Sequence, residues 1–117
     1  MPSTISYKRG DVVLIPFPFT DLTSSKRRPA LIISSEKFNS THEDVVVLGI
    51  TSQIPARLDE DEFQLPAEAL LLGGLPKASL IKLSKVVTLH QHLIVKRLGS
   101  IPNSVLEEVR ARFSSQF

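Results

Sequence analysis

The stretch KRRPALIIS, residues 26–34, places three consecutive cations directly before Pro29 and an apolar run. The run PALIIS (29–34) predicts a buried strand, because it is apolar and because proline is tolerated at the first position of a strand. Charges that serve solubility are scattered over a surface. These three are gathered where a rigid strand begins, which is how a phosphate site would arrange them.

Runs of the same kind flank this stretch on both sides. DVVLIPF (11–17) predicts a strand that ends near Pro16 and Pro18, since proline cannot donate a ladder hydrogen bond. Further strands are predicted at DVVVLGIT (44–51), EFQLP (62–66), ASLIKLSKVVTL (78–89) and HLIVKRLG (92–99). Residues 67–76 are expected to be irregular apart from one helical turn before Gly73-Gly74.

The C-terminal segment has the pattern of a helix. Pro102 suits a first helical position. Apolar residues then recur at helical spacing, at Val105, Leu106, Val109 and Phe113.

Short strands followed by one helix predict a mainly β fold with a C-terminal helix. We expect a single domain over residues 1–117: a small, strongly bent antiparallel barrel with the helix packed on it. An open sheet of the same strands is the alternative. A domain of this size buries somewhat less than about 70% of its unfolded surface, so homodimerisation would be a natural supplement to its core.

Composition excludes several classes of protein. The chain has no cysteine, which excludes disulfides, a thiol nucleophile and thiolate metal sites. No apolar run approaches the roughly 20 residues of a membrane span, and the N-terminus lacks the apolar core of a signal peptide. We therefore expect a soluble, cytoplasmic protein without a membrane partner.

The net charge is only +2, but the charges are unevenly distributed. No acidic residue lies between Glu68 and Glu107, whereas five cations do: Lys77, Lys82, Lys85, Lys96 and Arg97. Together with residues 26–28 they either form one basic face suited to a polyanion or lie as solvated side chains on unrelated surfaces.

The usual catalytic motifs are scarce. His90 and His92 would share a face if they lay in a strand, yet no third metal ligand has a matching spacing. The acidic run DEDE (59–62) is expected to be a solvated hairpin turn, because metal sites usually draw carboxylates from several elements. No P-loop or GxSxG motif is present. We expect neither a metal nor a cofactor.

Arg28 and the segment ITSQ (50–53) remain. Ile50 ends a run of core residues, so Thr51 should emerge at a strand terminus and offer a hydroxyl to a phosphate. The guanidinium of Arg28 gives a bidentate, permanently charged contact with phosphate. The alternative is that Arg28 is a surface charge and that Thr51 only caps a strand.

The chain resembles the MazF/PemK family of toxin endoribonucleases from about Tyr7 to Phe113. The similarity rests on the GD at 10–11, the RPA at 28–30 and the TSQ at 51–53, in the family's order and spacing. It implies a small SH3-like antiparallel barrel of the MazF/PemK/CcdB type, usually a homodimer. It further implies metal-independent, sequence-selective cleavage of single-stranded RNA, held in check by a cognate acidic antitoxin, with Arg28 and Thr51 as the catalytic residues.

The resemblance also assigns roles around these two residues. Lys26 and Arg27 would hold flanking phosphates, and Ser52 would assist Thr51. Gln53, Lys85, Phe17 and Phe19 are the remaining candidates for RNA binding, with the two aromatic rings stacking on bases or belonging to the core. The implied products are a 2′,3′-cyclic phosphate and a 5′-hydroxyl.

The chain departs from the family pattern in two places. Several members carry an acidic residue and a glutamine where this chain has Ser84 and Lys85, and the loop from 17 to 28 is shorter. Two other functions remain open: a non-catalytic barrel that binds RNA or antitoxin, and a gyrase-poisoning toxin of the same fold.

Overall fold

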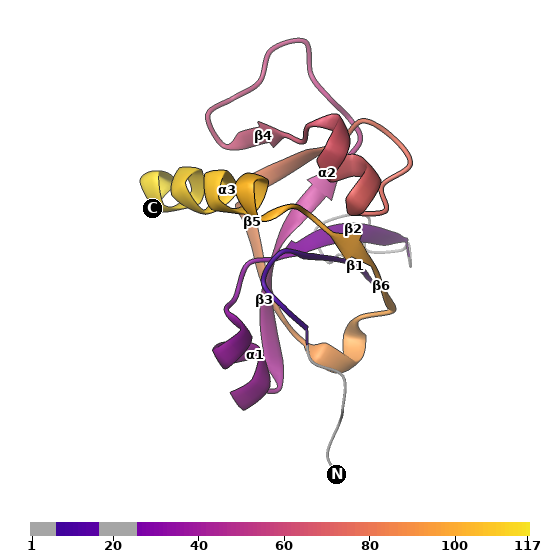
Figure 1. Ribbon diagram of the computed structural model, residues 1–117, viewed down its shortest axis with the longest axis vertical. Helices are drawn as coiled ribbons and strands as arrows, with labels where there is room; N and C mark the ends of the chain where they lie inside the picture. The colour runs from indigo at the N-terminus through magenta and orange to yellow at the C-terminus, as the bar shows by residue number, and fades with distance from the viewer. Residues whose placement is uncertain (1–6, 17–25) are drawn as a thin grey trace.

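The computed structural model describes residues 7–16 and 26–117 (Figure 1). Phe17 and Phe19 lie outside the described residues. The strands are β1 (Asp11–Pro16), β2 (Arg27–Ile32), β3 (Asp44–Thr51), β4 (Glu62–Gln64), β5 (Leu80–His90) and β6 (Lys96–Ser100). The helices are α1 (Glu36–Thr41), α2 (Ala67–Leu72), α3 (Asn103–Gln116) and the short 3₁₀ helix η1 (Gln91–Leu93).

The six strands form one antiparallel sheet in the order β4-β5-β3-β2-β1-β6. The mainly β fold with a C-terminal helix is confirmed. In the sheet described, the edge strands β4 and β6 do not pair with each other, so the sheet is open. Among the described residues, no helix is long and apolar enough to cross a membrane.

Two local features differ from the sequence prediction. Helix α1 was not expected; it forms because the Ser35 side chain accepts a hydrogen bond from the Phe38 N–H at 3.1 Å and caps the first turn. Strand β6 begins only at Lys96, because the His90 imidazole accepts a hydrogen bond from the His92 N–H and starts the turn η1. His90 and His92 therefore do not share a strand face.

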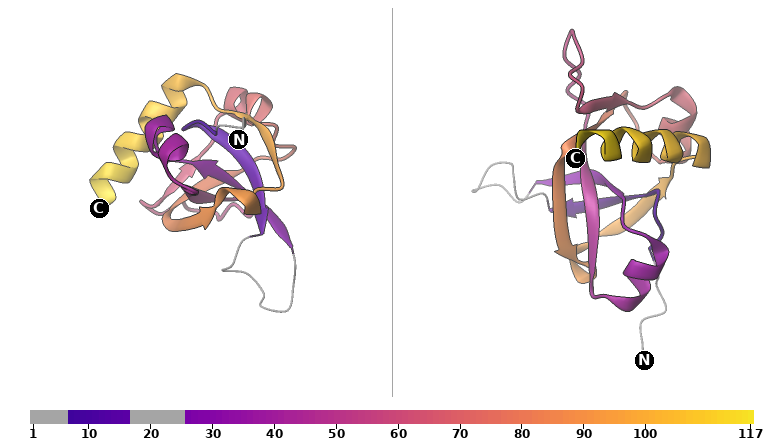
Figure 2. Two further views of the ribbon diagram at one scale, coloured as in Figure 1. Left: turned by 90° about the horizontal axis from the view of Figure 1, so that it is seen from below. Right: turned by 90° about the vertical axis from the view of Figure 1, so that its left-hand side faces the viewer.

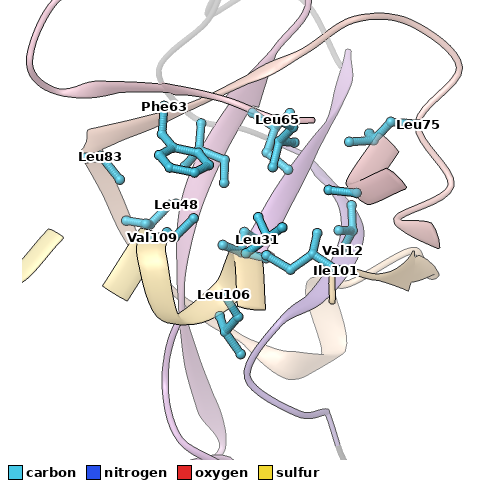
Figure 3. Packing of buried hydrophobic residues seen from close by; sticks show 14 residues of the cluster. Val12, Leu31, Leu48, Phe63, Leu65, Leu75, Leu83, Ile101, Leu106 and Val109 are labelled. Carbon is cyan, nitrogen blue, oxygen red and sulfur yellow. The ribbon is translucent and has the colours of Figure 1, made fainter. Parts of the chain in front are cut away.

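Alternating side chains give the sheet two apolar faces. One face is covered by α2 and α3, and Figure 3 shows Leu106 and Val109 of α3 beside Leu31 and Leu48 of the strands. Figure 2 shows α3 lying across the sheet. The other face carries a second cluster, drawn from four strands and Ile94: Val13, Ile15, Ala30, Ile32, Val45, Val47, Val87 and Leu89.

The GD pair at 10–11 ties β1 to β6. Gly10 has a φ of +99°, which a side chain would strain. The carboxylate of Asp11 is buried and accepts hydrogen bonds from the Lys8 N–H at 2.9 Å and the Ser100 hydroxyl at 2.6 Å. It also forms an ion pair with Arg97 at 3.1 Å. A buried carboxylate with these partners fixes the β1–β6 pairing.

Two leucines on different helices test the packing of α3. Leu106 is 5% exposed, whereas Leu71 on α2 is 79% exposed. We expect Leu106→Ala to lower the free energy of unfolding by about 2 to 5 kcal/mol, because it leaves a cavity beneath the helix. Leu71→Ala should change it by no more than about 0.5 kcal/mol. Urea denaturation measures both, and equal losses would contradict the assignment of α3 as the cover of this face.

Candidate active site

A pocket of about 260 Å³ opens where the strands β2, β3 and β5 meet the loop after β3. It brings together residues that lie far apart in the sequence. The lining residues are Arg28, Gly49, Ile50, Thr51, Gln53, Glu62, Lys82 and Lys85. Four of the predicted site residues are therefore in one place: Arg28, Thr51, Gln53 and Lys85.

The pairing of β2 with β3 puts Arg28 and Thr51 on the same face. Ala30 lies opposite Gly49 in this antiparallel ladder. Arg28 lies two residues before Ala30 on β2, and Thr51 lies two residues after Gly49 on β3. Side chains two apart on a strand point to the same face. Ala30 belongs to the second apolar cluster, so the two polar residues continue that face beyond its apolar part. Gly49 has no side chain to fill the space beside them.

Arg28 has unused hydrogen-bonding capacity. The residue is half-buried, and its Nε is fully buried without a hydrogen-bond partner among the described residues. A buried N–H without an acceptor costs free energy, which an anionic oxygen in the pocket would recover. The pairing with Ile15 on β1 holds the backbone of Arg28 in place.

Thr51 lies at the last position of β3 and is half-buried. Its Oγ1 accepts a hydrogen bond from the Gln53 N–H at 3.1 Å. This contact turns the chain so that Gln53 also lines the pocket. A hydroxyl that accepts one bond still has its own proton to donate, so Thr51 can donate to a ligand oxygen.

Sequence reasoning missed one component of the site, the ion pair between Glu62 and Lys82. Lys82 Nζ lies 2.8 Å from Glu62 Oε2, and Glu62 Oε1 accepts the Asp59 N–H at 2.8 Å. The bond from Asp59, with that from Lys82, holds the pKa of Glu62 below its usual range. The hydrogen bond to Glu62 raises the pKa of Lys82.

Lys85 reaches the pocket through an irregularity in β5. Leu48 of β3 pairs with Val86, while the next residue, Gly49, pairs with Lys82, so Leu83, Ser84 and Lys85 bulge out of the ladder. The Ser84 hydroxyl donates to the Asp61 carboxylate, which ties the bulge to the loop before β4. A bulge redirects side chains, and here Lys85 lines the pocket.

The other predicted residues surround this pocket or lie elsewhere. Lys26, Arg27 and Ser52 are exposed and do not line it. His90 lies at the far end of β3 and β5, where its Nε2 is 2.8 Å from the carboxylate of Glu43. Arg97 does not join the basic residues of the pocket, because it pairs with Asp11.

The acidic loop before β4 brings three carboxylates together. Those of Asp59, Asp61 and Glu62 approach within 4.8 Å of one another. Both oxygens of Glu62 are already hydrogen-bonded, and Asp61 accepts from Ser84. The carboxylates of Asp61 and Glu62 are therefore used to hold the loop.

The shifted pKa of Glu62 gives stability a defined pH dependence. A lowered pKa means that the ion pair contributes stability above the ordinary Glu pKa of 4.5 and loses it as the pH falls through the folded-state pKa. The pKa of Lys82 is raised from 10.5, so Lys82 loses its contribution to stability only at more alkaline pH.

We therefore expect wild-type stability to fall more steeply than that of Glu62→Gln as the pH falls below the ordinary Glu pKa of 4.5. Urea denaturation at several pH values measures the two slopes. Glu68→Gln, on the exposed surface of α2, is the matched control and should keep the wild-type slope. Parallel curves for wild type and Glu62→Gln would refute the contribution of the ion pair.

Comparison with known proteins places this chain in a family. Residues 8–117 match the sequence model of the PemK-like, MazF-like toxins of type II toxin-antitoxin systems. The endoribonucleases MazF2 of Mycobacterium bovis and MazF6 of Mycobacterium tuberculosis are each 31% identical over 86 residues, which cover 73% of this chain and 73% of theirs.

Solved structures agree with the fold. The chain superposes on a MazF from a MazE–MazF complex of Deinococcus radiodurans with a TM-score of 0.72 and 25% identity, over 96% of this chain and 95% of that one. It superposes on a mycobacterial endoribonuclease, solved with its cognate antitoxin, with a TM-score of 0.73 and 19% identity, over 94% and 93% of the two chains. The chain belongs to the PemK-like, MazF-like family, the MazF endoribonuclease toxins of type II toxin-antitoxin systems.

Proposed function

We propose that this endoribonuclease toxin cleaves single-stranded RNA without a metal ion in the pocket between β2, β3 and β5. Arg28 and Thr51 are its catalytic residues. The observation that carries the proposal is that Arg28, whose Nε has no hydrogen-bond partner among the described residues, lines one cationic pocket with Thr51. A permanently charged donor and a neutral donor at one point suit the oxygens of a phosphodiester.

The substrate supplies its own nucleophile. The ribose 2′-oxygen attacks the phosphorus, the bond from phosphorus to the 5′-oxygen breaks, and the products are a 2′,3′-cyclic phosphate and a 5′-hydroxyl. The 2′-oxygen loses one proton and the leaving 5′-oxygen gains one, so no water is consumed. Arg28 stays charged and neutralises the charge that develops on the phosphate, while Thr51 donates a hydrogen bond to a non-bridging oxygen. Solvent water takes up the proton of the 2′-oxygen and supplies the proton of the leaving 5′-oxygen.

The remaining predicted residues would bind the strand on either side. Gln53 and Lys85 line the pocket, and Lys26 and Arg27 lie exposed where β2 begins. Contacts of lysine and arginine with phosphates position an RNA without specifying its sequence. Ser52 would assist Thr51, and Phe17 and Phe19 would stack on bases.

Removing either catalytic side chain tests the proposal. We expect Arg28→Ala and Thr51→Ala each to lower the cleavage rate by about 10²- to 10³-fold, which is typical of a lost donor to transition-state charge. Both proteins should stay folded, because neither side chain belongs to an apolar cluster. Gel analysis of a labelled single-stranded RNA, with circular dichroism as the folding check, measures the effect.

The controls separate this mechanism from other reactions. Arg110→Ala on α3 and Thr41→Ala at the end of α1 should retain wild-type cleavage, since neither residue lines the pocket. Cleavage should continue in excess EDTA, and an RNA with a 2′-O-methyl group at the scissile nucleotide should bind without being cut. Undiminished cleavage by folded Arg28→Ala would overturn the assignment.

We also propose an acidic antitoxin as the regulatory partner, acting in the cytoplasm where RNA is the target. The MazF of Deinococcus radiodurans was solved with MazE, and the mycobacterial endoribonuclease with its cognate antitoxin. In this chain, Arg28 and Lys85 line the pocket while Lys82 is paired with Glu62, so the pocket keeps an excess of positive charge. An acidic segment would compete with RNA for the same cations.

We further propose that the chain forms a homodimer. The apolar face of α3 is used within the chain, so the surplus apolar surface lies elsewhere. Leu93 and Val95, 51% and 42% exposed, lie just before the edge strand β6, and burying them in a partner removes them from water. Light scattering should give a mass of twice the 13.0 kDa of one chain, at low and at high salt. A mass of one chain under both conditions would contradict the dimer.

A further inference from the structure

Glu62 anchors one end of the loop of residues 52–61, and Gln53 of this loop lines the pocket. Its Oε1 accepts the Asp59 N–H at 2.8 Å, and its own N–H donates to the Asp59 carbonyl at 3.1 Å. The side chain is 8% exposed, so this anchor is shielded from water. Gln53, at the other end of the same loop, lines the pocket with Glu62. The loop is therefore held in place by a carboxylate.

This anchor conflicts with the charge that the pocket needs. Among the described residues that line it, Glu62 is the one acidic side chain, and it is buried where a phosphodiester would bind. A buried carboxylate without a counterion repels a nearby phosphate and attracts a nearby guanidinium. Left alone, Glu62 would oppose RNA binding and compete with the substrate for Arg28.

Lys82, on the neighbouring strand β5, neutralises the charge of Glu62. It lies directly opposite Glu62 in the β4–β5 pairing and opposite Gly49 in the β3–β5 pairing, so all three occupy one row across the sheet. Its Nζ is 2.8 Å from Glu62 Oε2, and its side chain is 24% exposed, which places the contact at the wall of the pocket. With Lys82 in place, both oxygens of Glu62 are occupied.

We propose that Lys82 is a positioning residue for RNA cleavage: it neutralises the loop-anchoring carboxylate of Glu62, so that the pocket around Arg28 and Thr51 keeps its positive charge. The inference rests on the proposed function of Arg28 and Thr51. It assigns Lys82 an effect through Glu62 and not through direct contact with RNA. The two roles can be distinguished by experiment. If Lys82 acts through Glu62, its replacement has no effect once Glu62 has lost its charge; if Lys82 contacts RNA directly, its replacement still weakens binding.

A double-substitution cycle tests this inference. We expect Lys82→Met, which removes the charge and keeps the length, to lower the cleavage rate at limiting RNA about tenfold or more, because it leaves a carboxylate without a counterion in a phosphate site. Adding Glu62→Gln to this variant should restore most of the rate. Lys82→Arg should stay close to wild type, since it keeps the counterion. Lys37→Met, on the exposed surface of α1, is the matched lysine control and should be unchanged.

The salt dependence of RNA binding gives a second readout. Each phosphate contact to single-stranded RNA makes the logarithm of the affinity fall by about 0.7 for each unit rise in the logarithm of the salt concentration. If Lys82 itself contacts a phosphate, Lys82→Met and the double variant will show the same reduced slope and the same slow cleavage, which would overturn the inference. Recovery of both slope and rate in the double variant supports it.

Failure of the role proposed for Lys82 can be distinguished from failure of the proposed function. Wild-type protein that does not cleave RNA, or Arg28→Ala that still does, would refute the proposed site itself. Wild-type cleavage that depends on Arg28, combined with no rescue by Glu62→Gln, would refute only the role of Lys82. Urea denaturation of each variant shows whether a lost rate reflects unfolding, and Lys82→Arg covers the case in which Lys82→Met does not fold.

Discussion

The antiparallel register between β2 and β3 is the constraint on which the site depends. Ala30 opposite Gly49 places Arg28 and Thr51 on one face, at the end of the sheet where the apolar cluster gives way to polar side chains. A slip of one residue would turn every side chain of a strand to the opposite face. The apolar residues Ile32 and Val47 fix this register, because a slip would move them out of the core. Core packing therefore positions the side chains of Arg28 and Thr51.

The electrostatics of the pocket combine fixed cations with one buried acid. Arg28, Lys82 and Lys85 come from strands, or from a bulge within a strand, so their positions are set by backbone pairing. Glu62 serves the loop and is compensated by Lys82 at 2.8 Å. Within the part of the chain that the structure describes, Arg28 Nε has no acceptor, and an anionic ligand would supply one. An internal acceptor at this nitrogen would compete with any substrate.

The two faces of the sheet serve different purposes. α2 and α3 cover one face with leucine and valine side chains, and this face supplies much of the core. The other face is apolar at its centre and polar at the end that carries Arg28 and Thr51. Among the described residues, α2 and α3 pack on the first face, and the polar end of the second face lines the pocket. Buried Asp11 holds β6 against β1, which keeps the curved sheet in shape.

The strands, the C-terminal helix and the positions of Arg28 and Thr51 at strand ends could be predicted from the sequence. These signals are local: apolar alternation, prolines at strand limits and helical spacing after Pro102. Helix α1 also had a local signal, the capping residue Ser35, which the strand pattern around it obscured. Tertiary structure alone decided that the sheet is open, that β5 bulges at Lys85 and that Lys82 meets Glu62 twenty residues away. Such pairings depend on which strands become neighbours, and no periodicity within one strand records that choice.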